Sequence, residues 1–190
     1  MHQYQLDMPA SDIGDHFRAR IGKDVWEEGT VNALSPAPII VTGANGDRML
    51  KPCFWGFPPP RSSGAGGAGG AVLTVRNLES PFWIGNLRHV GLRCLVPATS
   101  FTLRAKGRAI ECRVRSEPVF AFAGTWRDTT DYPAFAILTT DANPALVDRG
   151  VFAMPVILDP AQQTRWLKDD WRQARQLVDS YPSQFLEIGA

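Results

Sequence analysis

The chain has 190 residues, 44% of them hydrophobic and 10% aromatic, enough for one substantial core but short for two ordinary domains, so we predict a single domain over residues 1–190. Twenty Lys and Arg against nineteen Asp and Glu give a net charge of +1, so total charge argues neither for nor against a polyanionic partner. Because the first residues hold no basic stretch before an apolar run and no segment approaches about eighteen consecutive apolar residues, we expect a cytoplasmic protein without an export signal or membrane span.

A short helix is the first predicted element. Ser11 and Asp12 are good N-terminal caps, and the helix is expected to continue to about Ile21. Ile13, Phe17 and Ile21 recur at four-residue spacing, which places them on one face of that helix. We therefore expect this face to lie on the core.

A glycine-rich loop is predicted over residues 58–71. Residues 58–70 read PPPRSSGAGGAGG, which has almost nothing to bury and a large ordering entropy to overcome. The strand signals on either side are too short to stand alone, so this is expected to be a mobile surface loop within one domain. It does not resemble a phosphate-binding loop, since no Gly-Lys-Ser/Thr ending follows and no strand directly precedes it.

Several apolar runs predict strands, and glycine-containing turns at 43–47 and 106–107 predict hairpins. In Ile110–Arg115 apolar residues alternate with charged ones, so one face of that strand should be buried and the other wet and basic. Residues 119–124 (VFAFAG) are apolar on both faces and should form a central strand. The first predicted hairpin has one strand at 39–41 and a second that reaches 54–56. The other predicted strands cover 72–75, 94–96, 101–105, 109–115, 119–126, 134–140 and 152–158.

Two helical stretches are predicted near the C-terminus. Asp159 and Pro160 are a strong helix start, and Trp166 and Leu167 of that helix should face the core. A second amphipathic stretch runs over 169–178, before Pro182. Many strands with a few helices and no regular βαβ alternation indicate an α+β fold.

Basic residues are concentrated in the middle of the chain. From Arg76 to Arg115 there are eight of them against two acids, Glu79 and Glu111, a local charge of about +6 (8 minus 2). These basic residues are Arg76, Arg88, Arg93, Arg104, Lys106, Arg108, Arg113 and Arg115.

The cysteines and histidines do not predict a metal site or another cofactor. Cys53, Cys94 and Cys112 lack metal-ligand spacing, and Cys94 and Cys112 sit in apolar runs where thiols act as small hydrophobic groups. The three histidines, at positions 2, 16 and 89, are too scattered to form a ligand set. We expect reduced, buried thiols and no metal.

Five collinear segments resemble the SOS-response-associated peptidase (SRAP) family. In the order of the chain they are FWGFP (54–58), RCLVPA (93–98), FAGTW (122–126), ILTTDAN (137–143) and MPVIL (154–158), with Asn32 and Ser35-Pro36 as a weaker match. The resemblance implies a single, mostly β domain with a curved, barrel-like mixed sheet, peripheral helices and a positively charged channel for single-stranded DNA. In the family, a cysteine at position 2 forms a thiazolidine with the ring-opened sugar of an abasic site, assisted by an Asn, a Glu and a His.

The positions that match this catalytic set hold other residues. Position 2 is His2, which cannot form a thiazolidine and whose bulk normally leaves Met1 in place. Leu103 stands at the position of the Glu and Val151 at that of the His, and neither side chain can transfer a proton. The Asn segment has two possible registers: either Asn77 matches the Asn, or that position is Val75. The sequence thus predicts an SRAP-like protein without the family's covalent chemistry.

Three functions follow from this resemblance. The first is non-covalent binding of single-stranded DNA in a DNA-damage context, with a base stacked on Trp55 and phosphates on a basic face. The second is an active SRAP-type enzyme that crosslinks abasic DNA or cleaves peptides with Cys53 or His2 in altered roles, and the third is a protein-interaction module without nucleic-acid binding. For Trp55 the alternative is a core or rim tryptophan, and for the arginines it is a solvated sheet face. The predicted DNA-binding residues are Trp55, Arg76, Asn77, Arg88, Arg93, Arg104, Arg113 and Arg115.

Overall fold

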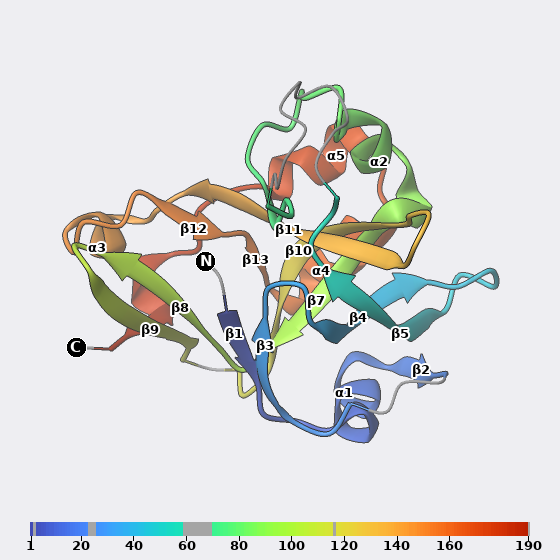
Figure 1. Ribbon diagram of the computed structural model, residues 1–190, viewed down its shortest axis with the longest axis horizontal. Coiled ribbons are helices and arrows are strands. Elements are labelled where there is room, and N and C mark those ends of the chain that lie inside the picture. The colour runs from blue at the N-terminus through green and yellow to red at the C-terminus, as the bar shows by residue number, and fades with distance from the viewer. Residues whose placement is uncertain (2, 23–25, 59–69, 116, 190) are drawn as a thin grey trace.

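The protein folds into two twisted sheets with short helices at their margins, as a computed structural model that describes residues 1, 3–22, 26–58, 70–115 and 117–189 shows (Figure 1). The strands are β1 (Gln3–Leu6), β2 (Ala19–Ile21), β3 (Gly29–Asn32), β4 (Pro36–Thr42), β5 (Arg48–Trp55), β6 (Thr74–Val75), β7 (Arg93–Ala98), β8 (Ser100–Ala105), β9 (Arg108–Val114), β10 (Phe120–Asp128), β11 (Pro133–Asp141), β12 (Ala153–Pro155), β13 (Ile157–Leu158) and β14 (Leu186–Ile188). The α-helices are α1 (Ala10–Phe17), α2 (Ile84–Arg88), α3 (Pro144–Val147), α4 (Pro160–Lys168) and α5 (Trp171–Ala174). Three 3-10 turns, η1 (Val90–Leu92), η2 (Arg175–Leu177) and η3 (Ser183–Phe185), complete the described elements. This mostly β architecture confirms the predicted α+β class, and most of the glycine-rich loop predicted over 58–71 lies outside the described residues.

The larger sheet curves back on itself. Its strand order is β12-β11-β10-β7-β4-β5-β2, and β5 pairs with β11 in parallel as well, at Phe54 with Ala134 and Trp55 with Phe135. The smaller sheet is antiparallel, in the order β14-β9-β8-β1-β3. The additional β5–β11 pairing gives the larger sheet its curvature. The sheet is mixed because the β2–β5, β6–β11 and β5–β11 pairs are parallel and the others are antiparallel.

The core lies where the two sheets meet. Tyr4 of β1 packs edge-on against Trp55 of β5, with ring centroids 5.3 Å apart, and against Phe122 of β10 at 5.9 Å. Strand β10 is central, since β7 and β11 flank it and its residues 120–125 are all buried. The expectation that this strand is apolar on both faces because it is buried on both is confirmed.

The β8–β9 hairpin follows the predicted pattern. Its turn places Lys106 at φ 50° and Gly107 at φ 79°, both in the left-handed region that a tight two-residue hairpin turn requires. In β9 the buried residues Ile110, Cys112 and Val114 alternate with exposed ones. The hairpin therefore has one face on the core and one in water.

The first helix is shorter than its sequence pattern predicts. It ends at Phe17, because Arg18 takes a left-handed conformation (φ 51°) and the next three residues form β2 beside β5. Ile21 is consequently exposed, and the residue at the cap position is Pro9 without a side-chain cap. Pairing with the edge of β5 overrides the helical periodicity here.

The segment predicted as one strand over 152–158 is two. Strand β12 pairs with β11 and β13 pairs with β10, so the chain changes partner at Val156. The Val156 amide donates to the Leu138 carbonyl, and its own carbonyl accepts from the Ala123 amide, both at 2.9 Å. This residue thus keeps both strands hydrogen-bonded while the chain crosses between them.

The C-terminal segment packs over β7 and β10. Helix α4 begins with a capping box between Asp159 and Gln162, as the Asp-Pro signal predicts, and Trp166 is fully buried with its indole N–H donating to the Cys94 carbonyl at 3.0 Å. The amphipathic stretch after it is split into α5 and η2. In the described part of the chain, no helix has the length and apolar character needed to cross a membrane.

Candidate functional site

Two of the positions that the resemblance marks as catalytic are apolar and buried. Leu103 lies on the inner face of β8 with 4% of its surface exposed, and Val151 follows α3 with 5% exposed. The two segments run close together, since Gly150 lies beside Ala105 and Lys106. His2 is outside the described residues. The two positions that the resemblance matches to a Glu and a His thus both hold buried hydrocarbon side chains.

Asn77 has a local hydrogen bond. Its side-chain oxygen accepts from the Glu79 amide at 3.1 Å, which closes a turn after β6. On either side, Arg76 pairs with Asp141 and Glu79 pairs with Arg175, so this exposed turn is held against β11 and η2. The two registers of the Asn segment are not distinguished by these contacts.

Trp55 and Arg93 do not belong to an exposed surface, which corrects their assignment to DNA binding. The Trp55 side chain is fully buried, and its indole N–H donates to the Leu73 carbonyl at 3.0 Å, so no base can stack on it. Arg93 is also fully buried: its guanidinium donates to the Asp169 carbonyl and lies 5.5 Å from the ring centre of Trp166. Burial lowers the pKa of Arg93 from its usual value, while Asp169 and Asp170 oppose that shift. These two residues hold the core and the C-terminal segment together.

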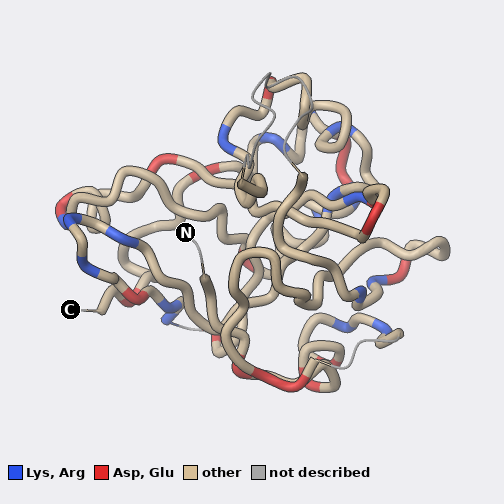
Figure 2. The backbone as a smooth tube through the Cα atoms, viewed as in Figure 1, with Lys and Arg blue, Asp and Glu red and all other residues tan. Residues whose placement is uncertain are grey.

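The other predicted arginines are exposed but lie in separate places. Arg88 ends α2, whereas Arg104, Arg113 and Arg115 project from the β8–β9 hairpin and the residue after it. Figure 2 shows the basic residues of the hairpin at one end of the molecule, well away from those near α2. Arg113 is paired with Glu111 at 2.9 Å, so the face expected to be basic is mixed in charge at its centre.

A denser group of cations lies at the free end of the hairpin. Lys106 lies in the turn and Arg108 directly follows it, and Arg149, from the segment after α3, meets them around a hollow of about 530 Å³. The Arg149 guanidinium donates to the Gly189 carbonyl, which holds it in this position. No carboxylate is among the described residues that line the hollow. We call Lys106, Arg108 and Arg149 the hairpin cluster.

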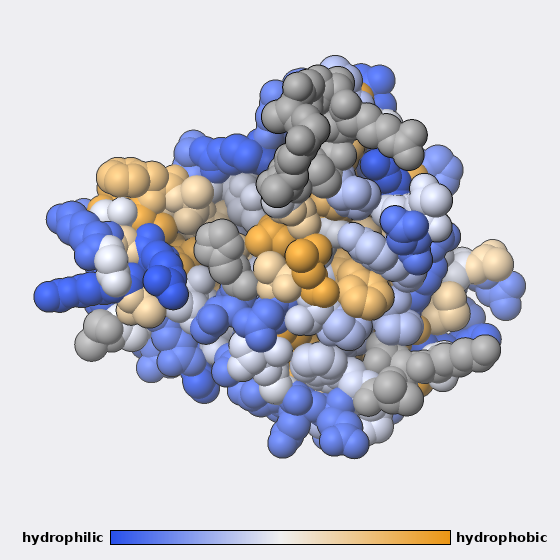
Figure 3. All heavy atoms as spheres, viewed as in Figure 1, coloured by the Kyte–Doolittle hydropathy of each residue, from blue (hydrophilic) through white to orange (hydrophobic). Residues whose placement is uncertain are grey.

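An exposed aromatic side chain lies in the same region. Phe152 is 74% exposed and follows directly on Val151, and Val147 at the end of α3 is exposed as well. The Phe152 carbonyl accepts from the Ala142 amide, so its backbone is fixed. Figure 3 shows apolar side chains gathered over the α3 region next to strongly hydrophilic ones at the hairpin. An exposed aromatic ring thus follows Arg149 of the hairpin cluster by three positions in the chain (152 minus 149).

Lys106 and Arg108 belong to the basic segment of the sequence but not to the predicted DNA-binding residues. Phe152 was not predicted to have a functional role. Arg149 stands outside the basic segment, and the only signal for it was the Asp148-Arg149 pair shortly before Met154-Pro155. Phe152 stands near the start of the apolar run 151–158, so no signal in the sequence marks it as exposed.

The three cysteine thiols are poor nucleophiles in the folded protein. Cys53, Cys94 and Cys112 are all buried, as expected. Burial raises the pKa of Cys112 to about 12, an effect that Arg149 opposes and Glu111 reinforces, and burial followed by the neighbouring Cys53 raises the pKa of Cys94 well above its usual value. Thiolate is the reactive form, so burial of all three thiols and the raised pKa values of Cys94 and Cys112 disfavour their reaction in the folded protein.

This predicts that a thiol reagent such as dithionitrobenzoate at pH 8 will label less than about one tenth of the three thiols in the native protein and all three in denaturant. Absorbance at the end of each reaction measures the number of thiols labelled. Fast labelling of one thiol before unfolding, located by mass spectrometry at Cys53, would instead show that Cys53 is accessible.

The possible metal ligands of the chain are its His, Cys, Asp and Glu side chains. Within residues 1, 3–22, 26–58, 70–115 and 117–189, no group of three or more His, Cys, Asp or Glu side chains is placed to hold a metal ion. The chemistry available near the hairpin cluster is therefore that of cations, amides and an exposed aromatic ring.

The comparisons with known proteins agree with the fold. The model of the SOS response associated peptidase (SRAP) family matches residues 3–189. A crystal structure of a protein from Bacteroides thetaiotaomicron is 21% identical with a TM-score of 0.80, over 99% of this chain and 90% of that one. Two from Bordetella bronchiseptica are similar as well: one is 18% identical (TM-score 0.80, 100% of this chain and 99% of that one), and a phage-related protein is 16% identical (TM-score 0.70, 100% and 93%). No curated protein matches the sequence.

A family match over nearly the whole chain is joined by the five collinear motifs and by the same fold in solved structures. The motif residues occupy core strands, as β7, β10 and β11 show. The chain belongs to the SOS response associated peptidase family.

Proposed function

We propose that this SRAP-family protein binds single-stranded DNA reversibly, in a DNA-damage context, and does not form the family's covalent adduct. The observation that carries the proposal is the hairpin cluster, three cations around one hollow with no carboxylate among its described lining residues. Arg104 lies on the opposite, exposed face of β8 and does not line this hollow. Such a group suits a phosphodiester backbone, whose contacts are electrostatic and independent of sequence.

The absence of covalent chemistry rests on the residues present. A general acid or base must carry a titratable proton, and neither Leu103 nor Val151 has one. Cys53, the remaining thiol beside the family's Trp-Gly segment, is only 1% exposed, so it cannot reach a sugar carried on DNA without a local opening of the strand. Reversible binding is the function that these side chains can still perform.

A single strand fits the site better than a duplex. Phe152 offers an exposed ring three positions after Arg149 (152 minus 149), and base stacking on an aromatic side chain contributes about 1–3 kcal/mol per base. Bases of a duplex are already stacked on one another and cannot use such a ring. Phe152 takes the role that the sequence assigned to Trp55.

The test compares three fluorescent oligonucleotides: an intact single strand, the same strand with one abasic site, and a duplex. If Lys106, Arg108 and Arg149 each contact one phosphate, the affinity for a single strand falls roughly twentyfold between about 50 and 200 mM salt. Fluorescence anisotropy measures this, and a denaturing gel of the abasic reaction is expected to show free DNA alone. A covalent band would overturn the reversible mechanism, and no binding at low salt would overturn DNA binding itself.

A further inference from the structure

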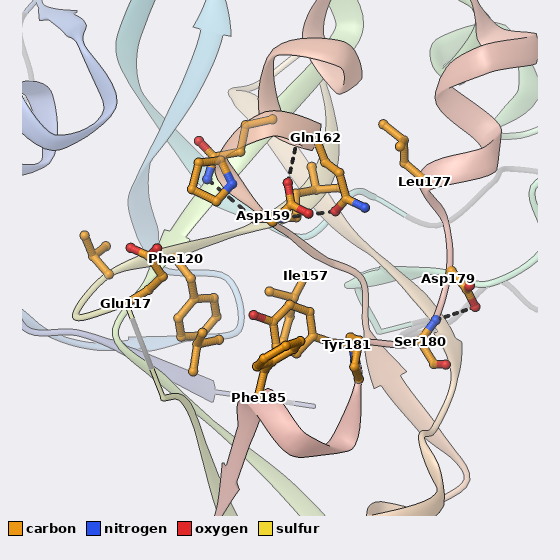
Figure 4. A pocket seen from close by; sticks show the side chains of 16 residues that line it. Glu117, Phe120, Ile157, Asp159, Gln162, Leu177, Asp179, Ser180, Tyr181 and Phe185 are labelled. Atoms are coloured by element: carbon orange, nitrogen blue, oxygen red, sulfur yellow. Dashed lines mark hydrogen bonds between the residues drawn. The ribbon is translucent and has the colours of Figure 1, made fainter.

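A second cavity, unrelated to the hairpin cluster, lies between the C-terminal segment and the sheets. Its volume is about 390 Å³, within the range of small-molecule sites. The start of α4 forms one wall, the ends of β9 and β10 a second, and the chain over 177–185 the third (Figure 4). Three segments that are far apart in the sequence thus enclose it.

The floor of the cavity is apolar. Phe120, Ile157 and Leu177 are buried residues that line it. The rings of Tyr181 and Phe185 meet edge to face above them, with centroids 6.5 Å apart. Phe185 is about half exposed, so one aromatic face is open to an incoming ligand. This floor suits an aromatic or alkyl group.

The rim of the cavity is acidic. Glu117, Asp159 and Asp179 lie on different sides of it in Figure 4, and no Lys, Arg or His is among the described lining residues. Asp159 accepts from the Gln162 amide at 2.8 Å and Asp179 from the Ser180 amide at 2.7 Å, so both carboxylates are fixed in place. The described ion pairs include none of the three.

The phenol of Tyr181 responds to this negative field. Burial raises its pKa above the usual value, and the nearby charges of Asp159 and Glu117 raise it further. Burial disfavours charge of either sign, but the contribution of Asp159 and Glu117 reflects a negative potential at the phenol, which favours a cation. Arg115, two positions before Glu117 in the chain, lines a different hollow, which Glu117 also lines.

We propose that this cavity binds a small organic cation, an ammonium group carried on an aromatic or alkyl body. The apolar part lies on Phe120, Ile157 and the Tyr181 ring, and the ammonium is held between the carboxylates of Glu117 and Asp159. Three carboxylates without a cation repel one another, and a bound ammonium relieves that repulsion. The cation also stacks against the aromatic faces of Tyr181 and Phe185.

The probes are three molecules with one apolar body and different charge: 4-phenylbutylamine, 4-phenylbutanol and 4-phenylbutyrate. Titrated into ¹⁵N-labelled protein, the amine is expected to shift the amide signals of Asp159, Ser180 and Tyr181. The alcohol is expected to bind at least about tenfold more weakly, and the carboxylate not to bind. Equal binding of amine and carboxylate, or no shift with the amine at millimolar concentration, would overturn the proposal.

A triple variant separates the role of charge from that of shape. Glu117→Gln, Asp159→Asn and Asp179→Asn together remove three charges but keep similar volumes, and Asn at 159 still caps α4. Affinity for the amine is expected to fall about tenfold while that for the alcohol stays the same. The matched control, Asp12→Asn with Glu27→Gln and Asp128→Asn, removes the same charge from exposed positions elsewhere and should leave both affinities unchanged. An equal loss in both variants would show that only net charge matters.

Discussion

Replacing Leu103 with glutamate is expected to lower the free energy of unfolding by about 3–5 kcal/mol and not to create a proton-transfer group. Leu103 is buried on the inner face of β8, opposite Ile110 of β9. The substitution removes a buried leucine side chain, which stabilises by roughly 2 kcal/mol, and places a carboxyl group where no described polar partner awaits it. Urea unfolding of the purified variant measures the loss.

The loss should depend on pH in a defined direction. Burial disfavours the carboxylate, so the folded-state pKa of the introduced glutamate lies above the unfolded-state value of about 4.3. Below the unfolded value the group is neutral in both states, and the destabilisation is least. As pH rises through the interval between the two pKa values, the unfolded state releases its proton first and the destabilisation grows.

Two control variants make this result specific. Leu103→Gln has the same size without the charge, so it should match the glutamate variant at pH 4 and be more stable than it at pH 7.5. Arg104→Glu alters the adjacent exposed residue of β8 and should change stability by no more than about 0.5 kcal/mol. A Leu103→Glu variant within about 1 kcal/mol of the parent would mean that this position opens readily to water.

Removing the charges of the hairpin cluster is expected to weaken binding of single-stranded DNA about a hundredfold at low salt. The variant carries Lys106→Gln, Arg108→Gln and Arg149→Gln, and its affinity is measured by fluorescence anisotropy over a range of salt concentrations. Each lost phosphate contact should make the slope of log affinity against log salt shallower by about 0.7, so three contacts change it by about 2. Glutamine keeps much of the length of each side chain without its charge.

The control for this variant is a protein with the same loss of charge on another face. Arg20→Gln, Arg165→Gln and Arg172→Gln alter exposed residues of β2, α4 and α5, none of them on the hairpin. This protein should bind DNA within about threefold of the parent and with nearly the same salt slope. If both triple variants lose affinity equally, binding follows total charge and the hairpin cluster is not the site.

Much of the fold could be predicted from local patterns. Strand β10 was predicted because it is apolar on both faces, the β8–β9 turn because Lys-Gly fits a tight hairpin, and α4 because Asp-Pro is a strong start. Strand β1 was missed, since four residues with two glutamines carry too little signal. The end of α1 was wrong because contact with β5, not periodicity, decides where that helix stops.

The site was less predictable for a geometric reason. A sequence motif gives the identity of Trp55 and Arg93 but not the direction of their side chains, and both point into the core. The hairpin cluster joins Lys106 and Arg149, which are 43 positions apart (149 minus 106), so no local pattern could bring them together. The burial of Leu103 and Val151 was easier to predict, because it agrees with the hydrophobicity of their side chains.

The position of β1 within the smaller sheet has a consequence for synthesis on the ribosome. Gln5 of β1 pairs with Ser100 of β8, so 95 residues (100 minus 5) must be added after Gln5 before its partner is in the chain. At typical rates of about 5–20 residues per second, this takes roughly 5–20 s. During that interval only β3 can pair with β1 in the smaller sheet. The edge of β1 that later pairs with β8 is then open to pairing with neighbouring chains. The nascent protein is therefore most prone to aggregate before β8 has left the ribosome.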